Sequence, residues 1–398
     1  MKGKVTLLIT LTILVISLTG CWNRRELTDL SIATAMGIDK SDDGYLVTAQ
    51  IINPSEIAAQ VPTTRTAVTS YRTTGATVFE ALRKLTKESP RKIYMSHMRT
   101  IVFGEDLAKE GIAKTLDFIS RDHEFRTDFY ILVARGVKAT EVLNILTPLE
   151  KIPANKIYYS LRMSEKAWAA THAVQLDELI SKLVSKGDNP VLTGILIKGD
   201  PEKGKKLSNV EQVKPSTLLE IDSLAAFKKD KLVGWLDMVE SIGFNHITGN
   251  VKSTLVAIPC PNGGKLAAEL IRTKPNVKGR VEDGKPKINI DHFVEANIAE
   301  TECAVDLSKT ENIYKIEKTL ANEIKSKMEK AVKRAQKDFK SDIFGFGEAI
   351  HRTDPKAWKE LKEDWNKKFE NLEVNIKVTV KIRRLGTIFN SLQKEIKE

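Results

Sequence analysis

The C-terminal part of the chain carries two hydrophobic patterns that constrain the fold more than any other feature of the sequence. Between 313 and 339 an apolar residue recurs every three or four positions, which predicts an amphipathic helix with a lysine-rich outer face. Between 372 and 382 apolar and polar residues alternate strictly, as in a strand with one buried face. Since each element must bury its apolar side, we expect the helix to pack on a sheet that contains this strand.

A second helix is expected between these two elements, because Asp354 and Pro355 supply an N-cap and a first-turn proline. Its aromatic residues follow helical spacing and are interpreted as core rather than as a ligand platform: Trp358, Trp365 and Phe369. Upstream, strand-like runs within 224–299 are joined by turns short enough for hairpins. The region 217–398 is therefore predicted to be an α+β domain, an antiparallel sheet packed with long amphipathic helices.

The region 22–200 alternates strand-like and helical segments, which predicts an α/β-like arrangement. Two β-like runs flank Asp43-Gly44 and indicate a hairpin, and the residues from Thr77 onward have the form of a helix capping box. A split near residue 150 into two subdomains is an alternative to one domain. Residues 201–216, dense in Lys, Gly, Glu and Pro, have the composition of a linker or a long hairpin loop, and we place the main domain boundary there.

The first residues have the organisation of an export signal. Lys2 and Lys4 provide a basic start, and the uncharged run from Val5 to Leu18 is fourteen residues long. As a helix this run would rise about 21 Å, short of the roughly 30 Å hydrocarbon core of a bilayer. We therefore expect residues 1–20 to be a signal peptide that is removed.

The end of this run, Leu18-Thr19-Gly20-Cys21, resembles the lipobox of bacterial lipoproteins. The resemblance implies an S-diacylglycerol on Cys21, cleavage before it, and an N-acyl group such as palmitate on the new N-terminus. Two or more acyl chains hold a protein firmly on a membrane, whereas one chain holds it only marginally. The alternative is that Cys21 is an ordinary buried or paired cysteine near the end of a signal.

The charge of the chain bears on its partners. The net charge is +11, and loss of residues 1–20 removes two lysines and no acidic residue, which leaves +9. Export argues against nucleic acid as the partner of these basic side chains. They either attract the protein to anionic lipid headgroups or only keep long helices in solution, and the sequence leaves both interpretations open.

Two further cysteines, Cys260 and Cys303, allow two interpretations. A disulfide between them is compatible with an oxidising compartment. Two cysteines do not form a disulfide scaffold, however, and the favoured interpretation is a pair of buried thiols.

Motifs of catalysis and cofactor binding are missing from the sequence. We find no phosphate loop, no dinucleotide fingerprint, no His-Glu-x-x-His and no Cys-x-x-Cys. The six histidines are scattered, so we expect no metal site and no cofactor. Ser89 and Lys92 fit a short nucleophile motif, but its companion motifs are missing. The prediction is a protein that is not an enzyme, and an envelope hydrolase is disfavoured.

One polar cluster is a candidate contact site for a partner protein. Six ionisable side chains lie between 121 and 128. The candidate contact residues are Arg121, Asp122, Glu124 and Arg126, together with Phe344 and Phe346 from a second stretch. The plainer alternative for 121–128 is an ion-paired connection between a helix and a strand, which is favoured because surface charge clusters are common.

Three separated stretches resemble the Ger(x)C family of spore germination lipoproteins, the C subunits of nutrient germinant receptors. They are Cys21-Trp22-Asn23-Arg24-Arg25-Glu26-Leu27 with the following Met36-Gly37-Ile38-Asp39, Ala226-Phe227-Lys228-Lys229-Asp230-Lys231-Leu232-Val233-Gly234-Trp235-Leu236, and Ser341-Asp342-Ile343-Phe344-Gly345-Phe346-Gly347-Glu348-Ala349. With Ser96-His97 and 121–126, the resemblance covers nearly the whole mature chain. Asn23 departs from the Asp expected after the Cys-Trp pair, which puts in doubt any role for a charge there.

The resemblance implies a multi-domain α+β fold and a non-enzymatic assembly and signalling subunit, lipid-anchored on the outer face of the spore inner membrane. It implies two membrane-embedded partners, an A-type subunit with a large soluble region and a transporter-like B-type subunit, in a receptor that responds to nutrients. No small-molecule ligand is assigned to this chain. The alternative function is a solute-binding lipoprotein that delivers a small nutrient to a transporter.

Overall fold

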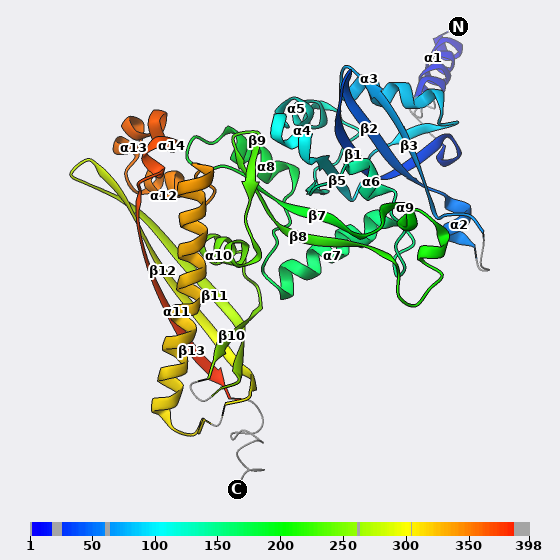
Figure 1. Ribbon diagram of the computed structural model, residues 1–398. Coiled ribbons are helices and arrows are strands. Elements are labelled where there is room, and N and C mark those ends of the chain that lie inside the picture. The colour runs from blue at the N-terminus through cyan, green and yellow to red at the C-terminus, as the bar shows by residue number, and fades with distance from the viewer. Residues whose placement is uncertain (1, 18–25, 60–63, 261–262, 304, 386–398) are drawn as a thin grey trace.

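The computed structural model describes residues 2–17, 26–59, 64–260, 263–303 and 305–385 of the chain. Within these residues two sheets carry the fold, one in each half of the chain, with helices packed against them (Figure 1). The predicted α+β class is confirmed.

The N-terminal sheet has nine strands in the described part of the chain, and its centre is parallel. β1, β5, β6 and β7 run in one direction, as expected where strands alternate with helices. Antiparallel pairs extend the sheet at both edges, and β4 pairs with the start of β1. The strands are β1 (Leu30–Ser41), β2 (Gly44–Ile52), β3 (Val68–Gly75), β4 (Lys92–Tyr94), β5 (Thr100–Gly104), β6 (Tyr130–Ala134), β7 (Val191–Gly199), β8 (Thr217–Lys228) and β9 (Lys231–Trp235).

Helices cover both faces of this sheet and enclose two separate apolar cores. One face is covered by α3 (Val78–Lys84), α4 (Glu105–Glu110), α5 (Ala113–Arg121) and α8 (Leu176–Val184), the other by α6 (Ala139–Leu143) and α7 (Pro153–Ala167). The shorter helices are η1 (Leu27–Asp29), α2 (Pro54–Ala58) and η2 (Leu85–Lys87). The predicted N-cap of α3 is confirmed, because the Thr77 side chain accepts the Glu80 N–H at 3.1 Å. The Glu80 side chain accepts the N–H of Ala76 at 2.8 Å, one residue before the N-cap, so the predicted capping box is formed only in part.

Residues 201–216 connect two paired strands of this sheet, β7 and β8. They form α9 (Pro201–Gly204) and η3 (Leu207–Asn209), and the buried Asn209 amide donates to the carbonyls of Leu146 and Thr217. The expected linker is thus a fixed hairpin connection. The expected domain boundary at 201–216 falls inside the sheet, which continues to Trp235 because β8 and β9 pair beyond it.

The C-terminal sheet has the order β10-β11-β12-β13: β10 (Thr254–Pro259), β11 (Lys265–Glu282), β12 (Lys285–Thr301) and β13 (Glu373–Arg384). β10, β11 and β12 are antiparallel, and β11 and β12 form a long hairpin that turns at Asp283-Gly284, both with positive φ. β13, in contrast, pairs parallel to β12. The prediction of an antiparallel sheet is wrong for this last pair, because the intervening helices return the chain to the end of the sheet where β12 began (Figure 1).

The predicted helix at 313–339 is confirmed as α11 (Thr310–Arg334), which continues into a π-helical turn, η4 (Ala335–Phe339). Its apolar side packs on the sheet through Ile316, Leu320, Ile324 and Met328. The second predicted helix is divided into α13 (Pro355–Leu361), η5 (Lys362–Asp364) and α14 (Trp365–Phe369), preceded by α12 (Phe346–Thr353). Trp358, Trp365 and Phe369 are buried in the same core, as expected.

Sequence patterns did not indicate α10 (Met238–Thr248), which lies in a region read as strands. Its residues from Ser241 to Ile247 are all buried, so no amphipathic stripe marks it. Its start has a capping box, in which Asp237 accepts the Glu240 N–H at 2.7 Å and Glu240 accepts the Asp237 N–H at 2.8 Å. The sequence therefore indicated this helix only through its capping box and not through a periodic pattern of apolar residues.

Cys260 and Cys303 form a disulfide, with 5.5 Å between their Cα atoms. The favoured interpretation as two buried thiols is wrong. Each cysteine follows the end of a strand, β10 or β12, and both strands pair with β11, so the sheet brings the two ends within bonding reach.

The helix α1 (Lys2–Ser17) coincides with the expected signal segment. Its described apolar side chains are exposed, Leu7 at 71% and Leu8 at 69%, and none belongs to the three cores, so the rest of the fold does not depend on it. Among the described residues no helix is long and apolar enough to span a bilayer. Cys21 lies outside the described residues.

A buried histidine pair joins α10 to β12 and should make stability depend on pH. His246 Nδ1 and His292 Nε2 are 2.9 Å apart, and burial lowers the pKa of both, that of His292 to about 4. In the unfolded chain these imidazoles bind protons near pH 6.5. Below that pH the unfolded state holds more protons than the folded state, so the free energy of unfolding falls as the pH falls.

We expect the stability advantage of the wild type over His292→Gln to shrink by about 1–2 kcal/mol between pH 6.5 and pH 5. Urea unfolding of both proteins at a series of pH values measures this difference, and it cancels titrations that the two proteins share. His123→Gln is the control, because the His123 side chain is 89% exposed. A difference that is constant with pH would contradict the assignment.

Candidate functional site

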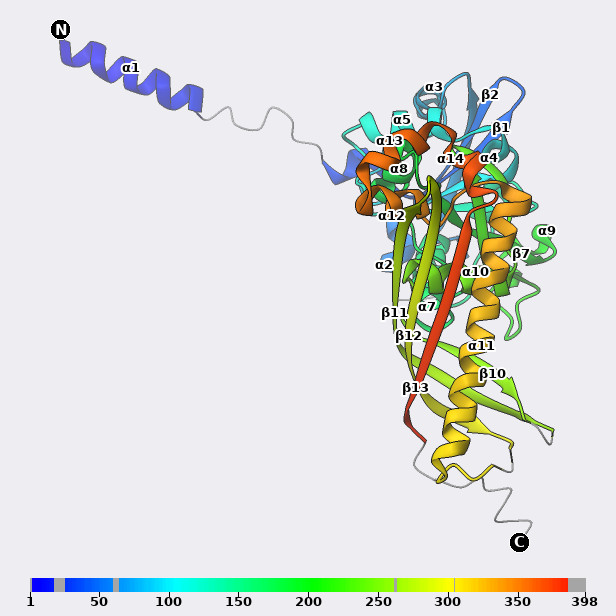
Figure 2. The same cartoon turned by 90° about the vertical axis from the view of Figure 1, so that its left-hand side faces the viewer.

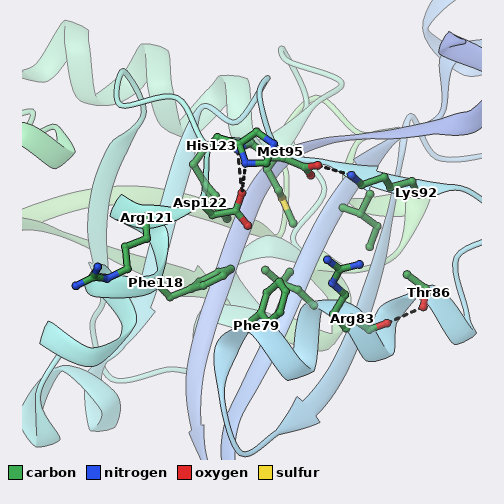
Figure 3. A pocket seen from close by; sticks show the side chains of 13 residues that line it. Phe79, Arg83, Thr86, Lys92, Met95, Phe118, Arg121, Asp122 and His123 are labelled. Carbon is green, nitrogen blue, oxygen red and sulfur yellow. Dashed lines mark hydrogen bonds and ion pairs between the residues drawn. The ribbon is translucent and has the colours of Figure 1, made fainter. Parts of the chain in front are cut away.

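A groove beside the N-terminal sheet contains half of the residues predicted to contact a partner (Figure 3). Its volume is about 500 Å³. We call it the α3–α5 groove, and it is lined by Phe79, Leu82, Arg83, Thr86, Lys92, Ile93, Met95, Phe118, Arg121, Asp122, His123, Glu124 and Phe125. The capped helix α3 forms one wall, and α5 with the turn after it forms the other.

Aromatic rings form the apolar part of the groove. The Phe79 and Phe118 ring centroids are 5.4 Å apart, and those of Phe118 and Phe125 are 5.8 Å apart. Phe79 is 44% exposed although it lies beside a well-packed core, and the Arg83 guanidinium stacks over its ring at 4.9 Å. An accessible aromatic ring next to an arginine is the kind of anchor that carries binding energy in protein interfaces.

Ion pairs organise the rim of the groove. Lys92, from β4, pairs with Glu124, and the Ser96 hydroxyl donates to the Glu124 carbonyl at 2.8 Å. Asp122 accepts the Glu124 N–H at 2.9 Å, which fixes the turn after α5. The arrangement contains both charge signs around an aromatic base, and the lining residues include no nucleophile paired with a base. It is suited to binding rather than to bond breaking.

The structure brings together three of the four predicted contact residues in 121–128. Asp122 and Glu124 form the rim, and Arg121 lines the groove but points outward in Figure 3, toward Asp117, with two hydrogen bonds of 2.9 Å. That pairing raises the pKa of Arg121 and lowers that of Asp117. Arg126 does not line the groove and instead makes a two-pronged bond to Asp128. The turn is therefore ion-paired, as the plainer alternative expects, and it also borders a groove; contact with a partner stays a prediction.

The prediction that Phe344 and Phe346 form a contact surface is wrong, because both are buried, at 8% and 0% exposure. Their rings stack at 5.0 Å, and Phe344 also packs on Phe244 of α10 at 5.7 Å. Gly345, with φ of +72°, makes the turn that directs both rings into the core before α12 begins. These two side chains stabilise the core and are not accessible to a partner protein.

The residue that organises this stretch is Asp342, which sequence patterns did not single out. Its side chain is fully buried and accepts four N–H groups. Oδ1 accepts from Phe344 at 3.1 Å and Phe346 at 3.2 Å, and Oδ2 accepts from Gly347 at 2.8 Å and the Trp365 indole at 2.9 Å. The available signal was an acidic residue shortly before a glycine turn and a helix start, which is a capping position.

Asp342 also joins the two halves of the chain, and we call this contact the Asp342 junction. The Asp342 carbonyl accepts the backbone N–H of Asn189 at 2.8 Å, and the Ser341 hydroxyl donates to the Phe227 carbonyl at 2.7 Å. Nearby, the Ser185 hydroxyl donates to Glu348 at 2.7 Å. The β7–β9 side of the N-terminal sheet is therefore held to the C-terminal helices through hydrogen bonds as well as apolar packing.

Two acidic groups at this junction have perturbed pKa values. Burial, and the nearby carboxylate of Asp188, raise the pKa of Asp342 to about 7, while its N–H donors act in the opposite direction. Burial raises the pKa of Asp188 to about 6, although Lys182 Nζ lies 2.7 Å away. Asp342 is fully buried and the Asp188 side chain is only 16% exposed, so we interpret the pair as structural.

No group of three His, Cys, Asp or Glu residues in the described part of the chain is placed to hold a metal ion. The α3–α5 groove and the Asp342 junction are thus the two places where the stretches singled out in the sequence gather in space.

Comparison with known proteins identifies the family. Residues 23–197 match the model described as the spore germination protein N-terminal domain, and residues 222–386 match the model described as spore germination B3/GerAC like, C-terminal. The crystal structure of the GerBC protein matches 90% of this chain and 99% of its own, with a TM-score of 0.54 at 20% identity, which establishes a shared fold.

Curated relatives match along their full length. Spore germination protein KC of Bacillus subtilis (strain 168) is 33% identical over 410 residues, covering 100% of both chains. Spore germination protein A3 of the same organism is 25% identical and covers 97% of this chain and 99% of its own. The chain belongs to the Ger(x)C family of spore germination proteins.

Proposed function

We propose that the protein is a lipid-tethered, non-catalytic subunit of a spore nutrient germinant receptor. The observation that carries this proposal is the match to spore germination protein KC, which covers 100% of both chains. The lipobox-like Leu18-Thr19-Gly20-Cys21 supports a tether on the outer face of the spore inner membrane. A tether raises the effective concentration of the subunit beside membrane-embedded partners of the A type and B type.

We propose that the α3–α5 groove is where a partner subunit binds. The groove supplies an exposed aromatic anchor, Phe79, on a helix whose start is fixed by its N-cap, Thr77. Charged groups of both signs surround the anchor, which suits recognition of a protein surface. The groove also lies near the start of β1, because Lys92 on its rim pairs in register with Leu30, which follows Cys21 by nine positions in the sequence. A tether at Cys21 would keep this groove close to membrane-embedded subunits.

The test is affinity purification of the tagged protein from spore membranes, with mass spectrometry of the co-purified proteins and of the N-terminal peptide. We expect one A-type and one B-type subunit, and a peptide that begins at lipid-modified Cys21. In Phe79→Asp the affinity for the partner should fall about thirtyfold, the effect of losing an interface anchor. Val213→Asp is the matched control, because Val213 is fully exposed and lies outside the groove.

The outcomes separate the parts of the proposal. Loss of the partners with Phe79→Asp but not with Val213→Asp supports the groove. Equal recovery from both variants contradicts the groove and leaves the subunit role in place. Recovery of an ATP-driven uptake system in place of A-type and B-type subunits would instead support delivery of a nutrient to a transporter. A chain that starts elsewhere, or has no lipid on Cys21, contradicts the tether.

A further inference from the structure

The outer face of the C-terminal sheet carries basic side chains that no other part of the described chain covers. α11 packs on the inner face through apolar contacts, and the inner residues of β12, such as Ile290 and Val294, are buried. On the outer face the exposed basic residues are Arg272, Lys274 and Lys278 on β11 and Lys377 on β13. We call these four the basic face.

Strand register shows that the four residues share one side of the sheet. Lys274 pairs with Phe293 of β12, Arg272 with Glu295, and Lys278 with Asn289. Lys377 pairs with Asp291 from the other neighbouring strand. Directly paired residues point to the same face, and alternate residues along each strand point to it as well. From Arg272 to Lys278 the face extends about 20 Å along the strand.

The basic face also holds two acidic residues, Glu295 opposite Arg272 and Asp291 opposite Lys377, and Glu295 is paired with Arg383. Lys287 of the same sheet likewise has an acidic partner, Glu373. In the ranges that the structure describes, no ion pair engages any of the four. Four unpaired cations on a broad sheet surface attract anionic groups at a surface rather than in a pocket.

An exposed apolar side chain accompanies the basic residues. Phe293 is 36% exposed and lies between Lys274 and Thr379 on this face. Basic residues together with an accessible apolar side chain match the interface of an anionic bilayer, where headgroups take the cations and the acyl boundary takes the apolar group.

The position of the chain start points to the same occupant. Figure 2 shows α11 to the right of β11, β12 and β13, and the blue segment at residues 26–30 to the left of these strands. Cys21 precedes Leu30 by only nine residues, which span at most about 30 Å. A lipid on Cys21 therefore brings the membrane to the side of the molecule that is away from α11.

We infer that the basic face of the C-terminal sheet binds the surface of an anionic phospholipid membrane, so that the protein lies along the bilayer rather than standing away from it. The inference rests on the proposed tether for its orientation. It gives the membrane two points of contact, the acyl groups at one end and the sheet at the other.

The test measures binding of the unlipidated chain from Trp22 onward to vesicles, since α1 contributes to none of the cores. The vesicles are equimolar phosphatidylglycerol and phosphatidylcholine, or phosphatidylcholine alone. The basic-face variant is Arg272→Glu, Lys274→Glu and Lys278→Glu together. The matched control is Lys315→Glu, Lys318→Glu and Lys330→Glu, three exposed lysines of α11 that make the same change in net charge.

We expect the wild type to bind the anionic vesicles, with an affinity that falls as salt is added, and to leave neutral vesicles unbound. The basic-face variant should bind about a hundredfold more weakly, whereas the α11 control should stay close to the wild type. Circular dichroism and thermal unfolding confirm that each variant is folded. Equal weakening in both variants, or none in either, overturns the inference.

A third outcome separates the membrane from a protein partner. If the basic-face variant binds vesicles normally but no longer co-purifies A-type and B-type subunits, the face belongs to a protein interface and the inference is overturned. If the subunits fail to co-purify even with the wild type while the vesicle difference is present, the receptor proposal fails and the membrane face stands.

Discussion

Replacing Asp342 by alanine is expected to lower the free energy of unfolding by about 3–5 kcal/mol, the range for removing one member of a buried charged network. The carboxylate accepts four N–H groups, and alanine would leave all four buried without an acceptor. An unsatisfied buried donor costs about 1–3 kcal/mol, less where the structure relaxes or water enters. Because the residue also belongs to the Asp342 junction, contacts between the two halves should loosen. Urea unfolding, followed by tryptophan fluorescence, measures the loss.

The matched variant is Asp342→Asn, which keeps the shape and one acceptor oxygen and should cost less than alanine. Limited proteolysis supplies an independent measure, since loosening of the junction should expose the stretch around Asn189. A loss below about 1 kcal/mol in Asp342→Ala would show that water replaces the carboxylate and that the junction is held by apolar packing alone.

Replacing Cys260 by alanine is expected to cost about 3–4 kcal/mol. The disulfide closes a loop between positions 43 apart in sequence, and opening it restores conformational freedom to the unfolded chain. The same loss is expected for Cys303→Ala, for the double variant and for the reduced wild type, because each change removes the same bond. Guanidinium unfolding with and without reductant measures all four.

Reductant is the control for this series, since it should not destabilise Cys260→Ala further. Single-variant losses that add in the double variant would instead assign the effect to two separately packed thiols. That result would restore the interpretation that the sequence favoured.

Local patterns in the sequence predicted most of the helices and strands that have one apolar face or a clear N-cap. α11 and β13 show their apolar stripe and alternation directly, and the N-cap Thr77 marks α3. α10 was not predicted, because it is buried on all sides and its sequence therefore shows no alternation of apolar and polar faces. The parallel direction of β13 was not predicted for a different reason. Alternation of apolar and polar residues shows which face of a strand is buried, but not whether the strand runs parallel or antiparallel to its neighbour.

The sites were harder to predict, because their residues meet only in the folded chain. The charges at 121–124 were visible in the sequence, but Phe79 and Lys92, which complete the α3–α5 groove, lie on other elements. Phe344 and Phe346 were predicted to form a contact surface, whereas both side chains are buried in the core. The residue that organises this stretch is Asp342, through its hydrogen bonds to backbone N–H groups. Pairing of Cys260 with Cys303 likewise depended on the order of three strands.

The parallel pairing of β12 with β13 has a consequence for the order in which the protein folds. Asn289 and Asn375, opposite each other in these strands, are separated by 86 positions, so the sheet closes only after the whole helical crossover has been made. During synthesis β12 is therefore an unpaired edge strand until β13 leaves the ribosome, and exposed edge strands can pair with other chains. Contacts this distant in sequence also form slowly. The C-terminal half thus depends on late-arriving residues for its solubility, and a chain cut short before β13 would be prone to aggregate.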